Sequence, residues 1–237
     1  MRSPQSTDIV ILDEPEECPY LPGETARLPL RMPVRKLTLS EADIRLAEGN
    51  RRTGEFLYQT RCPNCSACEP IRLDCNEFEF SPSQRRILRR GDRQLEIRKG
   101  PAIANQQRVD LFNRHRLERG LATKESAIDL KEYEWGFVRT CFSSFEISYW
   151  LSDQLAGIAI CDHGENSLSA VYTFYDPELS RQSVGTYSIL KQIQYCQENS
   201  LSHLYLGYYI NRSPHMAYKT NFHPNERLLN GHWVKFD

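Results

Sequence analysis

The chain has 237 residues, of which 40% are hydrophobic and 26% charged, and its formal net charge is −1. This is the composition of a globular protein with one large domain or two small ones, and it excludes a disordered chain. No stretch approaches the roughly 20 consecutive apolar residues of a membrane-spanning helix, and no apolar N-terminal run resembles a secretion signal. We therefore expect a cytoplasmic protein with no membrane partner.

The charge is distributed unevenly along the chain. Residues 81–120 contain eleven Arg or Lys residues but only four Asp or Glu residues. A near-neutral protein with one basic segment suggests a polyanion that docks at a defined place, although a solvated arginine-rich helix is the plain alternative. The candidate contacts to a nucleic acid are Arg85, Arg86, Arg89, Arg90 and Arg93.

The N-terminal part begins with a predicted strand over residues 8–12 and a Pro- and Gly-rich loop over residues 18–23. A helix should start after Thr38, whose hydroxyl can cap it, and should stop at Gly49. Two arginines and a glycine in residues 51–54 then precede a short aromatic strand.

Three cysteines, Cys62, Cys65 and Cys68, are spaced three residues apart in a proline-bounded loop. This spacing lets thiolates converge on one soft metal ion, and Cys18, which also lies in a loop, is the candidate fourth ligand. The pattern predicts a structural or regulatory zinc ion or iron–sulfur centre. Reduced structural thiols, or a redox-responsive site, are the alternatives.

The middle of the chain predicts alternating short elements. A strand over residues 71–80 is followed by a helix that begins at Ser81-Pro82 and ends at Gly91. A strand over 95–98 and helices over 102–119 and 130–142 follow.

The C-terminal part predicts an antiparallel meander over residues 145–151, 155–160 and 168–175. A helix over 183–198 then leads to a strand over 201–208, in which Gly207 suggests a close approach of backbone or ligand. This succession is that of an α+β, N-acetyltransferase-like fold with a mainly antiparallel sheet. We expect a Cys-rich subdomain over residues 1–100, packed closely against an N-acetyltransferase-like domain over 101–237.

Seven stretches, in order and over nearly the whole chain, carry a family resemblance. They are residues 18–23 (CPYLPG), 51–54 (RRTG), 62–72 (CPNCSACEPIR), 81–86 (SPSQRR), 183–187 (SVGTY), 205–209 (YLGYY) and 216–226 (MAYKTNFHPNE). Together they resemble the bacterial aspartate/glutamate leucyltransferases of the arginyl-tRNA–protein transferase superfamily. The resemblance implies transfer of leucine from leucyl-tRNA to proteins that begin with Asp or Glu, which marks them for degradation by the N-degron route. Arginyl transfer to the same N-termini stays open.

The chemistry of this reaction needs no cofactor. An aminoacyl ester is already activated, and an α-amino group with a pKa near 8 is partly deprotonated at neutral pH, so the protein has chiefly to position the reactants and stabilise the oxyanion. The sequence identifies no catalytic base. Candidates for positioning or oxyanion binding are Tyr187, Tyr208, Tyr218 and Lys219.

An acidic N-terminal residue needs fixed donors in place of water, and the fork of an arginine matches a carboxylate. Arg72, held between the cysteine loop and the following strand, is the first candidate to bind it, and Arg51 and Arg52 are the second. An ion pair of Arg72 with a carboxylate of the protein itself is the structural alternative.

Two other classes of protein compete with the transferase. A coenzyme A-dependent acetyltransferase would need small residues in its pyrophosphate loop, where this chain has Val184 and Thr186, so we disfavour it. A zinc-knuckle RNA-binding module would not need the strands and helix after Phe145.

Overall fold

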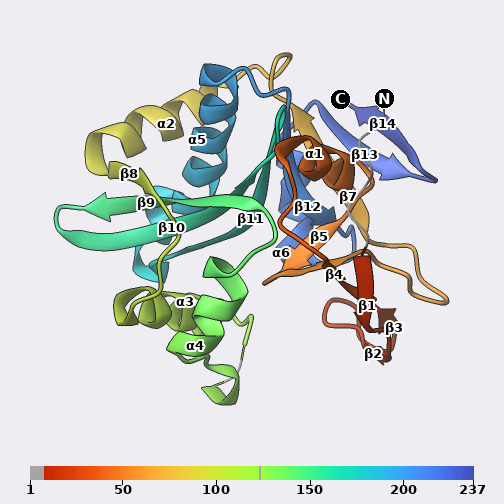
Figure 1. Ribbon diagram of the computed structural model, residues 1–237. Coiled ribbons are helices and arrows are strands. Elements are labelled where there is room, and N and C mark those ends of the chain that lie inside the picture. The colour runs from red at the N-terminus through yellow and green to blue at the C-terminus, as the bar shows by residue number, and fades with distance from the viewer. Residues whose placement is uncertain (1–7, 123) are drawn as a thin grey trace.

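The structure, a computed structural model, describes residues 8–122 and 124–237. Within these residues the strands form sheets of eight, four and two strands. The largest has the order β14-β13-β7-β12-β11-β10-β9-β8 (Figure 1). Its strands are β7 (Glu69–Asp74), β8 (Glu96–Gly100), β9 (Ser143–Leu151), β10 (Gln154–His163), β11 (Ser167–Tyr175), β12 (His203–Tyr209), β13 (Asn225–Leu229) and β14 (His232–Phe236).

Helices cover both faces of this sheet. The helices α2 (Pro82–Gln94) and α5 (Val184–Glu198) lie on one face, and α3 (Gln106–Glu118) and α4 (Leu130–Tyr133) lie on the other (Figure 1). Fully buried side chains such as Leu190 on the first face and Phe174 on the second form the two cores. Each such side chain contributes about 1.5–3 kcal/mol by leaving water. No helix among the described residues is long and apolar enough to cross a membrane.

The N-terminal layer is a four-stranded sheet with one helix. The strands, in spatial order, are β1 (Asp8–Leu12), β4 (Leu30–Pro33), β6 (Phe56–Tyr58) and β5 (Arg51–Thr53), and the helix is α1 (Leu39–Ala47). A small hairpin of β2 (Pro15–Glu17) and β3 (Thr25–Arg27) lies beside it. Leu46 and Leu57 pack this layer against Tyr205 of β12.

The limits of α1 are confirmed. The Thr38 hydroxyl accepts a hydrogen bond from the backbone N–H of Glu41, whose carboxylate accepts one from the backbone N–H of Thr38. This reciprocal capping satisfies N–H groups that have no partner inside the helix. Gly49 follows the helix at a φ of +82°, a conformation that favours glycine.

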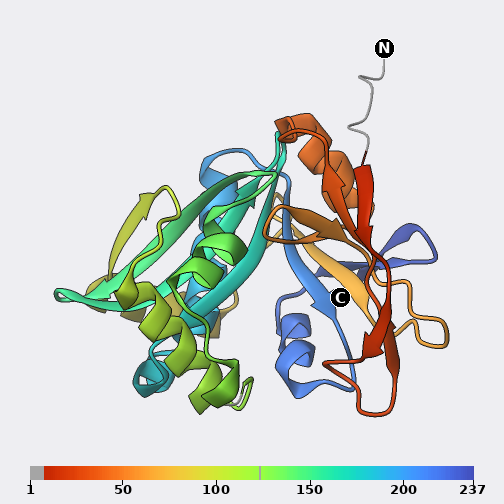
Figure 2. The same cartoon turned by 60° about the horizontal axis from the view of Figure 1, so that its bottom comes forward.

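The strands β11 and β12 are parallel neighbours for only three residue pairs, from Ser167 opposite His203 to Ser169 opposite Tyr205. Beyond these pairs they diverge, as the teal and blue strands of Figure 2 show. Parallel strands need a crossover, which α5 supplies. A mainly antiparallel sheet that splits at one parallel pair confirms the predicted N-acetyltransferase-like fold.

Several predicted limits were wrong. The helix α2 continues through Gly91, which lies inside the helix because the Tyr187 ring excludes a side chain there: a Cβ at Gly91 would clash with Tyr187 Cε2. The strand predicted over 71–80 is β7, which ends at Asp74. The helix predicted over 130–142 is α4 followed by a wider π-helical turn, η2 (Glu134–Val138).

The expected division at residue 100 does not coincide with a break in the large sheet. The strand β7 comes from the first hundred residues but lies between β12 and β13, and β8 forms the opposite edge beside β9. The Cys-rich part and the transferase part therefore share one sheet.

Candidate active site

The guanidinium group of Arg51 lies where β11 and β12 separate. Its Nη1 donates to Ser169 Oγ and its Nη2 donates to the backbone oxygen of Ala170, both at 2.9 Å. Ser169 is the last residue of β11 that pairs with β12. Arg51 thus satisfies the first carbonyl that the separating strand leaves unpaired, which a buried backbone group requires.

Gly207 of β12 lets Arg51 approach this closely. A Cβ at Gly207 would lie 3.2 Å from Arg51 Nη2, and the φ of this residue is +88°. The register between β12 and β7 shifts at the same place, between Tyr205 and Gly207. The prediction that something approaches the backbone closely at Gly207 is confirmed, and the approaching group is an arginine of the N-terminal layer.

Lys219 lies in the same region, in the 3₁₀ turn η4 (Tyr218–Asn221) that follows α6 (Pro214–Ala217). Only 6% of the residue is exposed, and its Nζ donates to the backbone oxygen of Tyr208 and to Met216 Sδ. Burial, followed by the positive charge of Arg51, lowers the pKa of Lys219 to about 7.

Neither cation has a carboxylate partner among the ion pairs formed by the described residues. The titratable groups that act on Lys219 are Arg51 and Cys68. Two cations that are close to each other, partly or fully withdrawn from water and without a counterion are costly. Such an arrangement is suited to an anionic substrate group.

Two tyrosines line this region. The rings of Tyr58 and Tyr208 lie with their centroids 6.3 Å apart, and the Tyr208 hydroxyl donates to the backbone oxygen of Gly49 at 3.4 Å. Burial raises the pKa of both phenols, so each remains a neutral hydrogen-bond donor at physiological pH. Tyr208 and Lys219 are the two predicted positioning residues that the structure brings together.

Arg52 follows Arg51 on β5 but has a different environment. Its Nε and Nη2 donate to the two carboxylate oxygens of Asp162 on β10, at 2.6 and 3.0 Å, and only 1% of its side chain is exposed. It cannot also receive a substrate carboxylate. The prediction of substrate binding by Arg52 is replaced by a structural role.

Arg72 also has a carboxylate partner. Its Nε donates to Glu226 at 2.6 Å, its Nη1 donates to the Tyr205 hydroxyl at 3.2 Å, and the guanidinium group stacks 4.2 Å from the Trp233 ring centroid. The structural alternative, an ion pair of Arg72 with a carboxylate of the protein itself, is present, and the partner is Glu226. Binding of a substrate by Arg72 stays a prediction, and Arg51 is better placed for it.

Two predicted tyrosines lie outside this region or at its rim. Tyr187 is fully buried between α2 and the sheet, where its hydroxyl donates to Asp92 at 2.8 Å and its ring packs against Tyr149. It packs the core and has no access to a substrate, which corrects its predicted positioning role. Tyr218 is 45% exposed beside Lys219 and stays a candidate.

The four cysteines of the predicted metal site, Cys18, Cys62, Cys65 and Cys68, are half-buried and unbonded. Burial and the nearness of the other three thiols raise the pKa of Cys68 to about 12. In residues 8–122 and 124–237, however, no three His, Cys, Asp or Glu side chains are close enough to hold one ion. As arranged, the thiols do not form a ligand set, and a metal would require the loop to close and Cys68 to lose its proton.

The five arginines of the basic segment lie on the exposed surface of α2. Leu88 and Gly91 form the buried side of this helix. Arg90 reaches the turn before α5, where its Nη2 donates to the backbone oxygen of Gln182. The arrangement leaves a basic helix face accessible to a polyanion.

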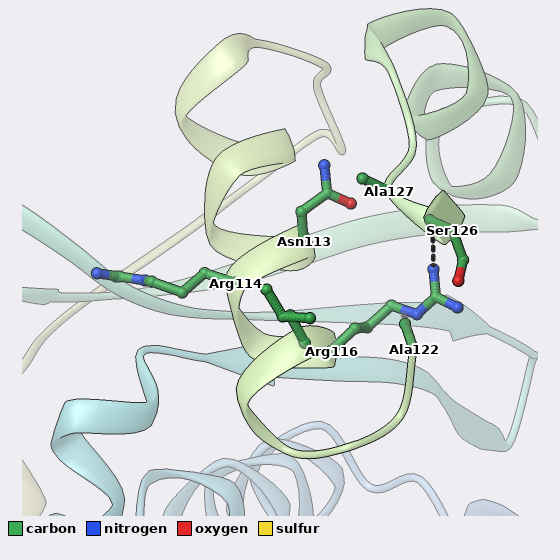
Figure 3. Close-up of a pocket in the computed structure, with 7 residues that line it drawn as sticks. Asn113, Arg114, Arg116, Ala122, Ser126 and Ala127 are labelled. Atoms are coloured by element: carbon green, nitrogen blue, oxygen red, sulfur yellow. Dashed lines mark hydrogen bonds between the residues drawn. The ribbon is translucent and has the colours of Figure 1, made fainter. Parts of the chain in front are cut away.

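A separate cavity of about 210 Å³ lies between α3 and the turn η1 (Lys124–Ser126) (Figure 3). Its lining includes Asn113, Leu117 and Ala127, and Arg116 Nη1 donates across one side to the backbone oxygen of Ser126 at 3.2 Å. None of the residues that line it belongs to the Arg51–Lys219 site.

Comparisons with known proteins place the chain in a family. The model for the N terminus of arginine-tRNA-protein transferase matches residues 16–86, and the model for its C terminus matches residues 107–229. Proteins named aspartate/glutamate leucyltransferase from Acinetobacter baumannii and Marinobacter nauticus are 35% and 33% identical. They are matched over 94% and 92% of this chain and 82% and 92% of their own. The chain belongs to the arginine-tRNA-protein transferase family. It is an aminoacyltransferase.

Solved structures resemble the chain more distantly. The C-terminal domain of a putative lysylphosphatidylglycerol synthetase from Agrobacterium fabrum has a TM-score of 0.44 at 15% identity, over 66% of this chain and 53% of that one. FemX has a TM-score of 0.45 at 9% identity, over 76% of this chain and 63% of its own. The family, and not these structures, identifies the donor of the reaction as an aminoacyl-tRNA and the acceptor as a protein.

Proposed function

We propose that this protein transfers leucine from leucyl-tRNA to the α-amino group of proteins that begin with Asp or Glu, and so prepares them for degradation through the N-degron pathway. The relatives that carry this name support the choice of leucine. Arginyl transfer is the second candidate, because the matching family models are those of arginine-tRNA-protein transferase.

The observation that carries the choice of acceptor is the cationic pair Arg51 and Lys219 at the strand split. A carboxylate bound there would offset the cost of keeping two cations away from water without a counterion. The hydrogen bonds that Arg51 makes with the described residues use Nη1 and Nη2, and neither uses Nε. We place the side chain of the acidic residue against Arg51.

The basic face of α2 is the proposed surface for the tRNA. Its arginines would contact phosphates, which position a nucleic acid without reading its sequence. A tRNA donor and eight cysteines without a disulfide suit a reducing cytoplasm.

One experiment tests the proposal. The protein is incubated with tRNA charged separately with Leu, Arg or Phe and with peptides that begin with Asp, Glu, Arg or Ala, and the products are weighed by mass spectrometry. We expect a leucine adduct on the Asp and Glu peptides alone. An arginine adduct would select the second candidate, and no adduct from any tRNA would overturn the function.

A further inference from the structure

We propose that Lys219 is the catalytic base of the transfer reaction and accepts a proton from the α-ammonium group of the peptide, which frees the nitrogen lone pair to attack the leucyl ester. The inference rests on the proposed function and concerns the same site. It assigns the proton acceptor, for which the sequence offers no candidate.

The position of Lys219 supports this role. Its Nζ donates to the backbone oxygen of Tyr208, on the strand β12 that borders the split, and to Met216 Sδ in α6. Arg51, the proposed partner of the acidic side chain, is close enough for its charge to act on Lys219. Three bonds in Asp and four in Glu separate the α-nitrogen from the carbon of the side-chain carboxylate. A peptide with its carboxylate on Arg51 therefore presents its nitrogen in the neighbourhood of Lys219.

The other groups in this neighbourhood do not serve as well. The phenols of Tyr58 and Tyr208 and the thiol of Cys68 are neutral, since burial raises the pKa of each. A guanidinium group does not act as a base in proteins. Lys219, whose pKa is lowered by burial and by Arg51, is the residue of this group that is partly free of its proton at neutral pH.

The proton and bond changes balance without a further reagent. The α-nitrogen forms a bond to the leucyl carbonyl carbon, and the bond from that carbon to the ribose oxygen of the tRNA breaks. Of the three protons on the α-ammonium group, one passes to Lys219 Nζ, one stays in the new amide and one passes to the ribose oxygen. Lys219 then releases its proton to water.

The charge of Arg51 links substrate choice to this step. The positive charge of Arg51 lowers the proton affinity of Lys219. A carboxylate bound to Arg51 offsets that charge, so an acidic N-terminal residue makes Lys219 a stronger base when it docks. A neutral residue such as Asn has no such effect. Selection of Asp over Asn should therefore appear in KM, and also in kcat at a pH above the pKa of Lys219, where the stronger base is free of its proton.

The test compares Lys219→Met with the wild type and with Lys219→Arg, which keeps a cation but cannot act as a base. Lys36→Met, on an exposed lysine, is the matched control. With an Asp peptide at saturation, the wild-type kcat should rise with pH at or above about 7, because the docked carboxylate offsets the charge of Arg51 that lowers the pKa of Lys219. Both Lys219 variants should lower kcat by about a hundredfold or more and remove that rise. Lys36→Met should do neither.

A second substrate separates catalysis from positioning. An aminooxy analogue of the Asp peptide carries a nitrogen that is unprotonated at neutral pH and needs no base. Lys219→Met should use this analogue within about tenfold of the wild-type rate. An equal loss with both peptides, or a retained rise of kcat near pH 7 in the variants, would overturn the inference. If the wild type itself forms no leucylated peptide, the proposed function fails instead.

Thermal melts show whether the variant folds and whether Lys219 is buried as described. The folded-state pKa of Lys219, about 7, lies below the unfolded value of 10.5, so its unfavourable burial is fully present below pH 7 and fades as the pH rises toward 10.5. Lys219→Met should therefore melt at a higher temperature than the wild type at pH 6, by a margin that shrinks toward pH 10. A margin that does not change with pH would contradict the buried cation on which the inference depends.

Discussion

The neighbouring residues Arg51 and Arg52 of β5 have different electrostatic environments. Arg52 is buried against Asp162 of β10, which neutralises it, whereas Arg51 reaches the strand split and, among the described residues, donates hydrogen bonds to a hydroxyl and a backbone carbonyl. Successive residues of a strand point to opposite faces, so the alternation separates a structural cation from an available one. The comparison teaches that a half-buried cation without a carboxylate partner among the described residues indicates where a substrate carboxylate belongs.

The largest effect should come from changing Arg52, the arginine that Asp162 neutralises. Arg52→Ala leaves Asp162 as a buried, unpaired charge and should lower the free energy of unfolding by about 3–5 kcal/mol. Denaturant unfolding measures it. The double variant Arg52→Met/Asp162→Leu removes both charges and should recover most of the loss. A fully stable Arg52→Ala protein would show that the pair is not buried as described.

The next largest effect should come from changing Arg51, which is available to a substrate carboxylate. Arg51→Ala should lower kcat/KM for Asp and Glu peptides by about a hundredfold or more, because a desolvated carboxylate loses its partner. Binding of leucyl-tRNA should survive, which filter binding can check. If the variant keeps the wild-type preference for Asp over Ala peptides, Arg51 does not bind the acidic residue.

Arg72 sharpens the comparison, because it was the first candidate from sequence and has a carboxylate partner in the structure. Arg72→Ala should cost about 1–3 kcal/mol of stability through the lost bonds to Glu226 and Tyr205. We expect the preference for acidic N-termini to persist in peptide competition. Its loss in a well-folded variant would restore Arg72 as the binding residue.

Exposed cations form a third case. Replacing Arg86 and Arg90 of α2 by Glu should weaken tRNA binding and reduce its dependence on log salt concentration by about one unit of slope for each lost phosphate contact. Transfer at saturating tRNA should be nearly unchanged. An unaltered affinity and salt slope would remove this face from the tRNA surface.

The smallest effect on catalysis should come from the cysteines, since we expect aminolysis of an already activated ester to proceed without a metal. We predict that protein purified without oxygen holds one zinc ion or iron–sulfur centre on Cys18, Cys62, Cys65 and Cys68, and that Cys65→Ser loses it. Elemental analysis of both proteins measures this. Activity should fall by less than about tenfold, as for a structural site. Metal-free wild type with a fully active variant would exclude the centre.

Sequence reasoning identified the order of elements because hydrophobic periodicity, caps and turn residues are local. It failed where a distant residue decided the outcome. A glycine is typical of a helix end, yet Gly91 lies inside α2. It is there because the ring of Tyr187, nearly a hundred residues later, occupies the position of a side chain. Likewise, Arg51 and Arg52 were indistinguishable until Asp162 was found beside one of them.

The candidate site could be predicted only in part for the same reason. Lys219 was one of several positioning candidates, and its burial beside Arg51 depends on three separate segments meeting at the split. Gly207 was the one local signal of this meeting, since a glycine inside a strand pattern indicates close approach.

The central place of β7 in the large sheet has a consequence for how the chain acquires its structure. Arg72 on β7 contacts Tyr205 and Glu226, which follow it by 133 and 154 residues. A strand that pairs only with later segments must wait, during synthesis, for almost the whole polypeptide to leave the ribosome. The cysteine loop that leads into β7 is held at its start by the small N-terminal hairpin, where the backbone N–H of Arg61 donates to the backbone oxygen of Arg27. Its other end is fixed only when β7 pairs with the late segments, so a fragment that ends near residue 100 should not complete this fold by itself.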